Sequence, residues 1–417
     1  MIKLAKKNRR LSWTLVDQAM VSGVNFLVAI VIARFLGIKE FGVFTLLWMS
    51  VLFIQSIQMA MISSPMMSIG PKQDNNERAS YYGAVITHQI IFSITSSVFL
   101  YIAIILSNYY FPQWSIVDYA FLLSLTVFLS QNQDFIRRLF FIEGRVLAAF
   151  LNDVISYGGR LVVLFVLFLK AEPSLHSVFW VMSITLSISV ISGFLMLYKP
   201  SFDYQYNLKI LQRHWKMSKW LAGSALMQWT SGNYFIVVAG ALFGPISVGV
   251  LRAASNIIGI SNILFLGLEN IVPQSASRHL IVSGVAGLKS YLMKVFIFGG
   301  VAILALAIFL SAFSEQILTL LYGKEYADYG YILIWYSMIS IISYSIIPLS
   351  IGLRTLENTK PLFISYFITT IFSILTASIL VATFELNGVM TGMLINNLIM
   401  LLIAYVCFTK TCQPDNH

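Results

Sequence analysis

Charged and amide side chains recur at helical spacing inside apolar stretches of this sequence. The clearest set lies within residues 248–272, where Arg252, Ser255, Asn256 and Gly259 follow the period of an α-helix. Such spacing gives one polar face on an otherwise apolar helix. A guanidinium stays charged at any reachable pH, so we expect Arg252 and Asn256 to face a wet cavity and bind an anionic group. The alternative is that these small polar residues only pack helices together.

A second buried cation is predicted near the middle of residues 149–169. Arg160 lies there, with Asn152, Asp153 and Ser156 on the same side of the helix. A guanidinium inside a membrane needs a carboxylate, water or an anionic ligand. Asp153 is the nearest carboxylate, and both a structural pair with it and an anion site remain open.

Acidic residues inside apolar stretches are candidates for a proton or cation site. Asp17 is the best placed, about 9 Å into the first helix at 1.5 Å per residue, and Asp153 and Glu269 are the others. Glu269 lies close to a helix end and could instead reach the interface. Asp134 is different, because an intrahelical pair with Arg137 or Arg138 accounts for it.

Further polar residues extend these faces on other helices. We expect a substrate to contact them as well, although Arg34 could also snorkel from its helix end. They are Gln18, Asn25 and Arg34 near the start of the chain and Gln228 in its second half.

The composition requires membrane helices to position these side chains. Hydrophobic residues make up 58% of the 417 residues and charged residues 11%, with a mean hydropathy of +0.81. A soluble domain has about a quarter charged residues, so soluble folds are excluded. At about 20 apolar residues per crossing, the apolar stretches predict twelve helices, over residues 11–36, 41–69, 82–106, 118–140, 149–169, 177–198, 220–243, 248–272, 291–313, 331–353, 362–383 and 386–408.

The distribution of basic residues supports this count. Most of the 27 Lys and Arg residues fall at the N-terminus and in alternate connections, and the other connections hold only Arg34, Lys39, Lys170 and Lys324. Lys and Arg favour the cytoplasmic side, so both termini are predicted to be cytoplasmic. The basic surplus is explained by topology, and we expect no nucleic acid partner. The long first apolar run predicts an uncleaved helix rather than a signal peptide.

An internal repeat relates the two halves at an offset of about 207 residues. Gly37 and the sequence Phe41-Gly42-Val43-Phe44 match Gly244 and Val248-Gly249-Val250-Leu251. Parallel repeats of six helices share one orientation in the membrane. We therefore predict an all-α polytopic membrane protein with two pseudo-symmetric six-helix bundles around a central cavity: an N-terminal bundle (1–198), a cytoplasmic linker (199–219) and a C-terminal bundle (220–417).

Catalytic and metal motifs are missing from the sequence. The two cysteines lie close together near the C-terminus, the five histidines are scattered, and no phosphate-binding glycine loop occurs. We expect no catalytic residues, no metal and no cofactor.

The end of the first helix resembles a known signature. Ala33-Arg34-Phe35-Leu36-Gly37 followed by Glu40-Phe41-Gly42-Val43-Phe44 is similar to the opening motif of polysaccharide and O-antigen flippases. These belong to the multidrug, oligosaccharidyl-lipid and polysaccharide exporter superfamily. Gly249-Val250-Leu251-Arg252-Ala253-Ala254 resembles their eighth helix. The resemblance implies helices one, two, seven and eight around a cavity and alternating access; many relatives carry fourteen helices.

The resemblance makes a flippase the leading hypothesis. Its substrate would be an undecaprenyl-diphosphate-linked oligosaccharide in the bacterial cytoplasmic membrane, with membrane lipids, H⁺ or Na⁺ and a polysaccharide polymerase as further partners. The alternative is a cation-coupled multidrug exporter of the same fold, for which a cavity of carboxylates would be typical. A membrane-embedded polymerase or glycosyltransferase is disfavoured, because no paired acids stand in the outward connections around 107–117 and 314–330.

Overall fold

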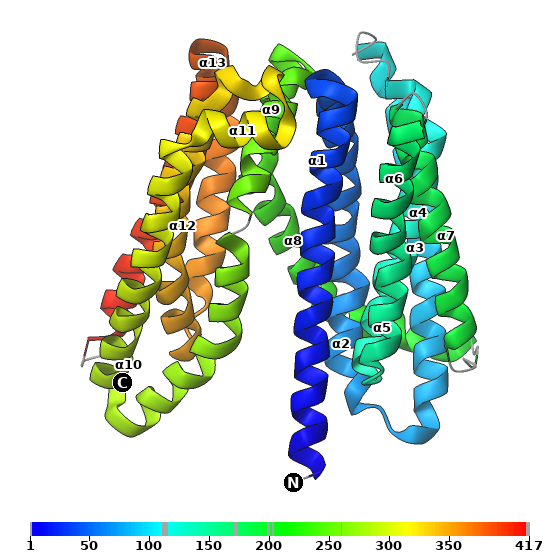
Figure 1. Ribbon diagram of the computed structural model, residues 1–417. Coiled ribbons are helices and arrows are strands. Elements are labelled where there is room, and N and C mark those ends of the chain that lie inside the picture. The colour runs from blue at the N-terminus through cyan, green and yellow to red at the C-terminus, as the bar shows by residue number, and fades with distance from the viewer. Residues whose placement is uncertain are drawn as a thin grey trace. The chain divides into compact units, whose positions relative to one another are not determined.

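The computed structural model describes residues 2–110, 116–170, 174–197, 201, 204–259 and 261–413. Within these ranges it describes all side chains except those of residues 2–12, 14, 15, 75, 76, 204, 205, 261–267 and 269–271. In the described ranges every regular element is a helix, and no strand occurs (Figure 1).

The first part of the chain forms long helices joined by short turns. The elements are α1 (Ile2–Gln58), η1 (Met59–Ser63), α2 (Ser64–Ile69), η2 (Gly70–Lys72), α3 (Asn75–Tyr110), η4 (Ile116–Tyr119), α4 (Ala120–Ile142), α5 (Val146–Asp153), η5 (Val154–Gly158), α6 (Gly159–Lys170) and α7 (Leu175–Met196). The elements η1 and η5 are single π-helical turns, which continue the helices on either side of them.

The second part repeats this pattern. Its elements are α8 (Tyr204–Phe243), α9 (Pro245–Ile258), α10 (Ser261–Ala312), α11 (Ser314–Tyr322), η6 (Lys324–Tyr329), α12 (Gly330–Thr355) and α13 (Lys360–Thr411). Three long helices contain a break with positive φ, at Gly37 in α1, at Gly284 in α10 and at Glu385 in α13. Each break divides one continuous stretch into two helices.

The fold class predicted from the sequence is confirmed. Once these breaks are counted, the twelve predicted apolar stretches fall on helical segments of the described residues, and the stretch 248–272 is divided between α9 and α10. Seven helical stretches are long and apolar enough by themselves to cross a membrane, namely Val16–Lys72, Glu77–Tyr110, Val146–Lys170, Leu175–Met196, Val272–Ala312, Lys324–Thr355 and Lys360–Thr411. Many large apolar side chains are exposed along these helices, including Phe99, Leu106, Val162 and Leu375. The chain is a multi-pass membrane protein.

Two segments differ from the sequence-based expectation. The polar stretch 199–219, which the sequence analysis assigns as a linker outside the twelve predicted helices, is helical from Tyr204 onward and forms the first part of α8. The connection at 314–330 was expected to be a loop, but it contains α11 and η6. Both segments carry polar residues on an exposed face. Their low hydropathy alone is typical of a loop, although the segments are helical.

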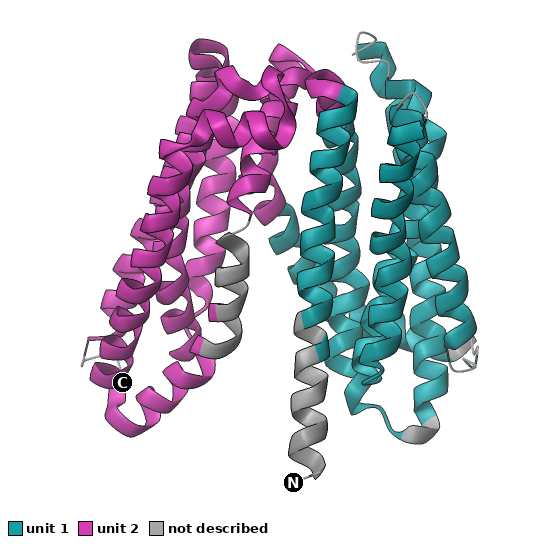
Figure 2. Cartoon of the chain, in the orientation of Figure 1, with its two compact units in different colours: residues 1–36, 43–226 teal, residues 37–42, 227–417 magenta. Residues whose placement is uncertain are grey.

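The chain divides into two compact units (Figure 2). Unit 1 comprises residues 1–36 and 43–226, and unit 2 comprises residues 37–42 and 227–417. In unit 1, α4 packs against both α3 and α7. Its core contains Met66, Tyr81, Phe135 and Ile210. The core of unit 2 joins α10, α12 and the end of α13.

Candidate functional site

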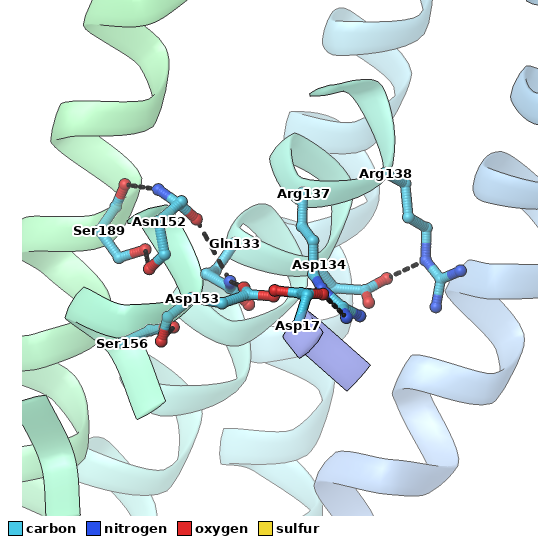
Figure 3. Close-up of polar contacts among 9 residues, drawn as sticks. All are labelled: Asp17, Gln133, Asp134, Arg137, Arg138, Asn152, Asp153, Ser156 and Ser189. Atoms are coloured by element: carbon cyan, nitrogen blue, oxygen red, sulfur yellow. Dashed lines mark hydrogen bonds and ion pairs between the residues drawn. The ribbon is translucent and has the colours of Figure 1, made fainter. Parts of the chain in front are cut away.

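A buried ionic cluster lies in unit 1, where α1, α4 and α5 meet. Asp17 comes from α1, Arg137 from α4 and Asp153 from the last residue of α5 (Figure 3). We call these three residues the Arg137 cluster. The π-helical turn η5 begins directly after Asp153, and such turns occur frequently at functional sites.

One guanidinium holds both carboxylates of the cluster. Arg137 donates from Nη2 to Asp17 Oδ2 at 2.7 Å and from Nε to Asp153 Oδ2. The side chain of Arg137 is 13% exposed, and those of Asp17 and Asp153 are fully buried. Charges this deep are costly to bury unless they are paired and hydrogen-bonded.

Amide and hydroxyl groups on α4, α5 and α7 position the side chain of Asp153. Gln133 donates from Nε2 to Asp153 Oδ1 at 2.7 Å and to Asn152 Oδ1 at 3.2 Å. Asn152 in turn donates to the carbonyl of Ser189 on α7 at 2.7 Å, and Ser189 donates back to the carbonyl of Asn152. This network joins α4, α5 and α7 and fixes the orientation of the carboxylate (Figure 3).

The cluster contains one acid more than it has bases. Two ionised carboxylates and one guanidinium carry a formal charge of −1, and the neighbouring Arg138 is already paired with Asp134 at 2.6 Å. Asp17 Oδ1 is buried and accepts no hydrogen bond from any described residue. Uptake of one proton or one monovalent cation would neutralise this charge, and that is the chemistry the cluster offers.

Arg160 on α6 is buried and has no acid partner among the described residues. Its side chain lies over the rings of Tyr157 and Trp48, with distances from Cζ to the ring centroids of 5.3 Å and 5.9 Å. The residue is 3% exposed, and its Nε has no acceptor among the described residues. Of the two alternatives for Arg160, a pair with Asp153 and an anion site, the structure does not form the first, because Asp153 pairs with Arg137 instead. Cation–π contacts hold the guanidinium and leave its hydrogen-bond donors for another group.

Arg252 on α9 is a second arginine inside an apolar helix, and it lies in unit 2. It is half-buried on the same helix as Asn256, and Tyr322 and Tyr336 lie near enough to interact with its charge. No described carboxylate forms an ion pair with it. The face predicted from the sequence includes Ser255, whose hydroxyl donates to the carbonyl of Arg252 at 3.0 Å within the same helix.

The other predicted site residues lie at scattered places. Gln18 and Asn25 are exposed on α1, and Arg34 is exposed near its break. Gln228 on α8 donates to the Tyr366 hydroxyl at 3.1 Å within unit 2. The side chain of Glu269 lies outside the described residues.

The structure brings together Asp17 and Asp153, which the sequence proposed separately, and adds residues that the sequence missed. Arg137 and Gln133 were not candidates, because an intrahelical pair with Asp134 was sufficient to explain Arg137. A signal was nevertheless available: Asp17 and Asp153 each lie in an apolar stretch with no basic residue within four positions. Two unpaired acids require a cation from another helix.

Among the described side chains, no group of three or more His, Cys, Asp or Glu residues could hold a metal ion. The ionic chemistry of the described site therefore comes from the Arg137 cluster, Arg160 and Arg252.

Solved structures of low sequence identity share this fold. An inward-facing multidrug resistance MATE family transporter of the MOP superfamily superposes with a TM-score of 0.76 at 17% identity, covering 94% of this chain and 93% of that one. The lipid II flippase MurJ in an inward closed conformation gives a TM-score of 0.71 at 14% identity, with coverage of 96% and 90%. A MOP superfamily transporter from Pyrococcus furiosus gives 0.67 at 16% identity, with coverage of 97% and 95%.

The fold is therefore that of MOP superfamily transporters and flippases. Residues 31–330 match the family model described as polysaccharide biosynthesis protein. The chain belongs to this family, which confirms the resemblance predicted from the motifs around Gly37 and Gly249. No protein of curated function matches the sequence.

Proposed function

We propose that this protein is a flippase for an undecaprenyl-diphosphate-linked oligosaccharide, the repeat unit of an O-antigen, capsule or exopolysaccharide. It moves this lipid from the inner to the outer leaflet of the bacterial cytoplasmic membrane by alternating access. The polysaccharide biosynthesis family supports a substrate of this class. The proposed topology has both termini in the cytoplasm, and a polysaccharide polymerase is the proposed consumer of the product.

The observation that carries this proposal is the pair of membrane-embedded guanidiniums without acid partners. Arg160 in unit 1 and Arg252 in unit 2 form no ion pair with any described carboxylate. An uncompensated cation is costly inside a membrane, and a diphosphate is a ligand that would offset this cost with paired, charge-assisted hydrogen bonds. We propose Asn256, Gln228, Arg34, Asn25 and Gln18 as further polar contacts for the substrate.

We propose the Arg137 cluster as the coupling site, with Asp17 as its titrating group and H⁺ or Na⁺ as the driving ion. The surplus negative charge of the cluster supports this assignment, because a buried net charge favours uptake of a cation. Glu269 is a further candidate for coupling. On this proposal the protein performs transport without a catalytic reaction.

The test uses purified protein in proteoliposomes that contain a lipid-diphosphate-linked oligosaccharide. Translocation is scored by oxidation of the sugar with a membrane-impermeant periodate. Arg252→Ala removes the charge-assisted hydrogen bonds. Loss of one such bond, worth about 1.5–3 kcal/mol, lowers the rate by roughly one to two orders of magnitude, so the rate should fall at least that far. Arg252→Lys should fall less, because an ammonium keeps the charge and loses the bidentate geometry.

Thermal stability separates this role from a structural one. If Arg252 paired with a carboxylate instead, Arg252→Ala would lower the melting temperature, and removing that acid as well would restore it. Arg278→Ala is the matched control, because this arginine is exposed on α10. Normal translocation by correctly folded Arg160→Ala and Arg252→Ala proteins would contradict the proposal.

A second candidate, a cation-coupled multidrug exporter, is favoured by the paired carboxylates of the Arg137 cluster. On that reading Asp17 and Asp153 would bind cationic drugs directly. Efflux of a fluorescent organic cation from the same proteoliposomes, abolished by Asp17→Asn, together with no movement of the lipid-linked sugar, would select the exporter.

A further inference from the structure

Helix α8 is longer than the hydrocarbon core of a membrane is thick, so its first part must lie outside that core. The helix spans Tyr204–Phe243, which is 40 residues and therefore about 60 Å at 1.5 Å per residue. A bilayer core is about 30 Å thick. The predicted spanning part begins at residue 220, so residues 206–219 lie beyond the core or at its interface. We call residues 206–219 the α8 arm.

One face of the α8 arm is fixed to unit 1. Ile210, His214 and Ser218, spaced four residues apart, are almost completely buried. The Tyr81 hydroxyl hydrogen-bonds His214 Nε2 at 3.0 Å, and the Ser218 hydroxyl donates to the carbonyl of Met61 at 2.9 Å. The arm is therefore held on the body of unit 1 at a defined rotation about its own axis.

A second face of the α8 arm is apolar and exposed. Leu208, Leu211 and Trp215 follow the i, i+3, i+7 spacing of one helical stripe. They are 47%, 48% and 54% exposed. This stripe adjoins the docked face, because Leu211 lies about 20° from Ser218 around the helix axis at 100° per residue.

The third face is basic. Lys209, Arg213 and Lys216 follow the same type of spacing, and Lys219 continues the cluster next to the apolar stripe. All four are exposed, and none forms an ion pair with a described residue. The positive charge of this face is therefore available to an external anion.

We propose that the α8 arm is an interfacial helix that binds anionic phospholipid headgroups. The apolar stripe enters the boundary of the acyl chains, and the basic face reaches phosphate groups of the same leaflet. Three features support a lipid partner: the apolar and basic stripes occur together, the apolar stripe includes Trp215, and the helix continues directly into the span predicted at residues 220–243. This combination is typical of helices that lie in the membrane interface.

The charge complementarity also predicts the preferred lipid. Each basic side chain near an anionic surface contributes about 1 kcal/mol, or about fivefold in binding. The long stems of lysine and arginine let them reach headgroups from a helix whose apolar side is immersed. Phosphatidylglycerol should therefore associate with this protein more strongly than phosphatidylcholine does.

The first experiment measures this preference on the full chain in bilayers. Spin-labelled phosphatidylglycerol and phosphatidylcholine are compared through their relative association constants with the protein. The variant Lys209→Gln/Arg213→Gln/Lys216→Gln should lose most of the preference, by up to about fivefold per residue. The matched control is Arg278→Gln/Lys289→Gln/Lys294→Gln, which removes three exposed basic residues from α10 and should retain the preference.

The second experiment locates the apolar stripe. A nitroxide is attached to Leu211→Cys after Cys407→Ala and Cys412→Ala have removed the native thiols. The label should be more accessible to oxygen than to a water-soluble nickel chelate. A label in water, or an equal loss of lipid preference in both triple variants, would overturn the proposal. A label shielded from both reagents would also overturn it and would indicate an acidic protein partner on this surface.

Discussion

Gly42 and Gly249 occupy equivalent positions in a reciprocal contact between the two repeats. A Cβ atom on Gly249 would lie 3.2 Å from Gly42 N and 2.6 Å from the carbonyl oxygen of Ile38. A Cβ atom on Gly42 would collide with the carbonyl oxygen of Pro245. Ile38 and Pro245 are related by the same repeat offset as the two glycines, so each repeat presents its glycine to the first turn of the other.

This contact is prepared by matching backbone breaks. Gly37 and Gly244 both adopt a φ of 79°, with ψ near the extended region, a conformation that favours glycine. Each is followed by a new helix whose first turn enters the contact. The Glu325 carboxylate accepts the Ile38 N–H at 3.2 Å and satisfies one free donor at this helix start.

Substitution of the contact glycines tests this arrangement. Gly42→Ala and Gly249→Ala should each lower the melting temperature strongly, because the methyl group meets backbone atoms that cannot rotate away. Gly23→Ala is the control, since a Cβ there meets nothing within 4 Å and alanine favours a helix by about 1 kcal/mol. Equal melting temperatures for all three variants would show that the contact does not form.

Asp17→Asn tests the coupling proposal. The variant removes the surplus charge and leaves the pair between Arg137 and Asp153 intact, so the protein should fold normally. Its translocation rate should no longer respond to an imposed proton or sodium gradient. Arg137→Gln is the contrasting variant: it leaves two buried carboxylates without a cation and should cost about 3–5 kcal/mol of stability. Unchanged gradient dependence in Asp17→Asn would instead indicate that a downstream polymerase drives export.

The pH dependence of stability should depend on His214. Burial of the ring, assisted by the charges of His88 and Arg213, lowers the pKa of His214 to about 4 from its ordinary 6.5. Between these two pH values the unfolded state binds a proton that the folded state does not. Stability should therefore fall as the pH falls from 6.5 to about 4, by up to about 3 kcal/mol.

Thermal unfolding of the purified protein across this pH range provides the measurement. His214→Gln should flatten the pH dependence, whereas His279→Gln, at an exposed position on α10, should leave it unchanged. A wild-type slope in His214→Gln would mean that other groups account for the acid sensitivity.

The predicted topology can be checked with compartment-specific reporters. Fusions after Lys170, Gly244 and Lys324 should all report the outer side, and a fusion after Lys219 should report the cytoplasm. The physical basis is the exclusion of Lys and Arg from translocated connections. An inner signal at one of the first three positions would show that the helix count is wrong from that point onward.

The sequence predicted the helices well because a membrane span is a long-range compositional signal. Hydropathy did not predict the helix at the α8 arm, because the charged residues there lower the hydropathy of a helical segment. Ile210, His214 and Ser218 recur every four residues and alternate with the stripe of Leu208 and Leu211. That pattern is typical of an amphipathic helix, although the high polarity of the segment obscures it.

The candidate site was only partly predictable. Local spacing identifies which residues share a face of one helix, and it selected Asp17, Asp153 and Arg160 in this way. It cannot identify a partner on another helix, so the role of Arg137 between Asp17 and Asp153 was missed. The same limit applied to Arg160, because the competition of Arg137 for Asp153 depends on the packing of α4 against α5.

The placement of Gly37–Gly42 has a consequence for biosynthesis. This short segment belongs to unit 2, although the helices on both sides of it belong to unit 1. Its contacts with Pro245 and Gly249 require about 200 further residues to be synthesised, which takes on the order of 10–40 s at ribosomal rates. Throughout that interval residues 37–42 lack their final neighbours, so a membrane chaperone that recognises unfinished helical segments has time to act there.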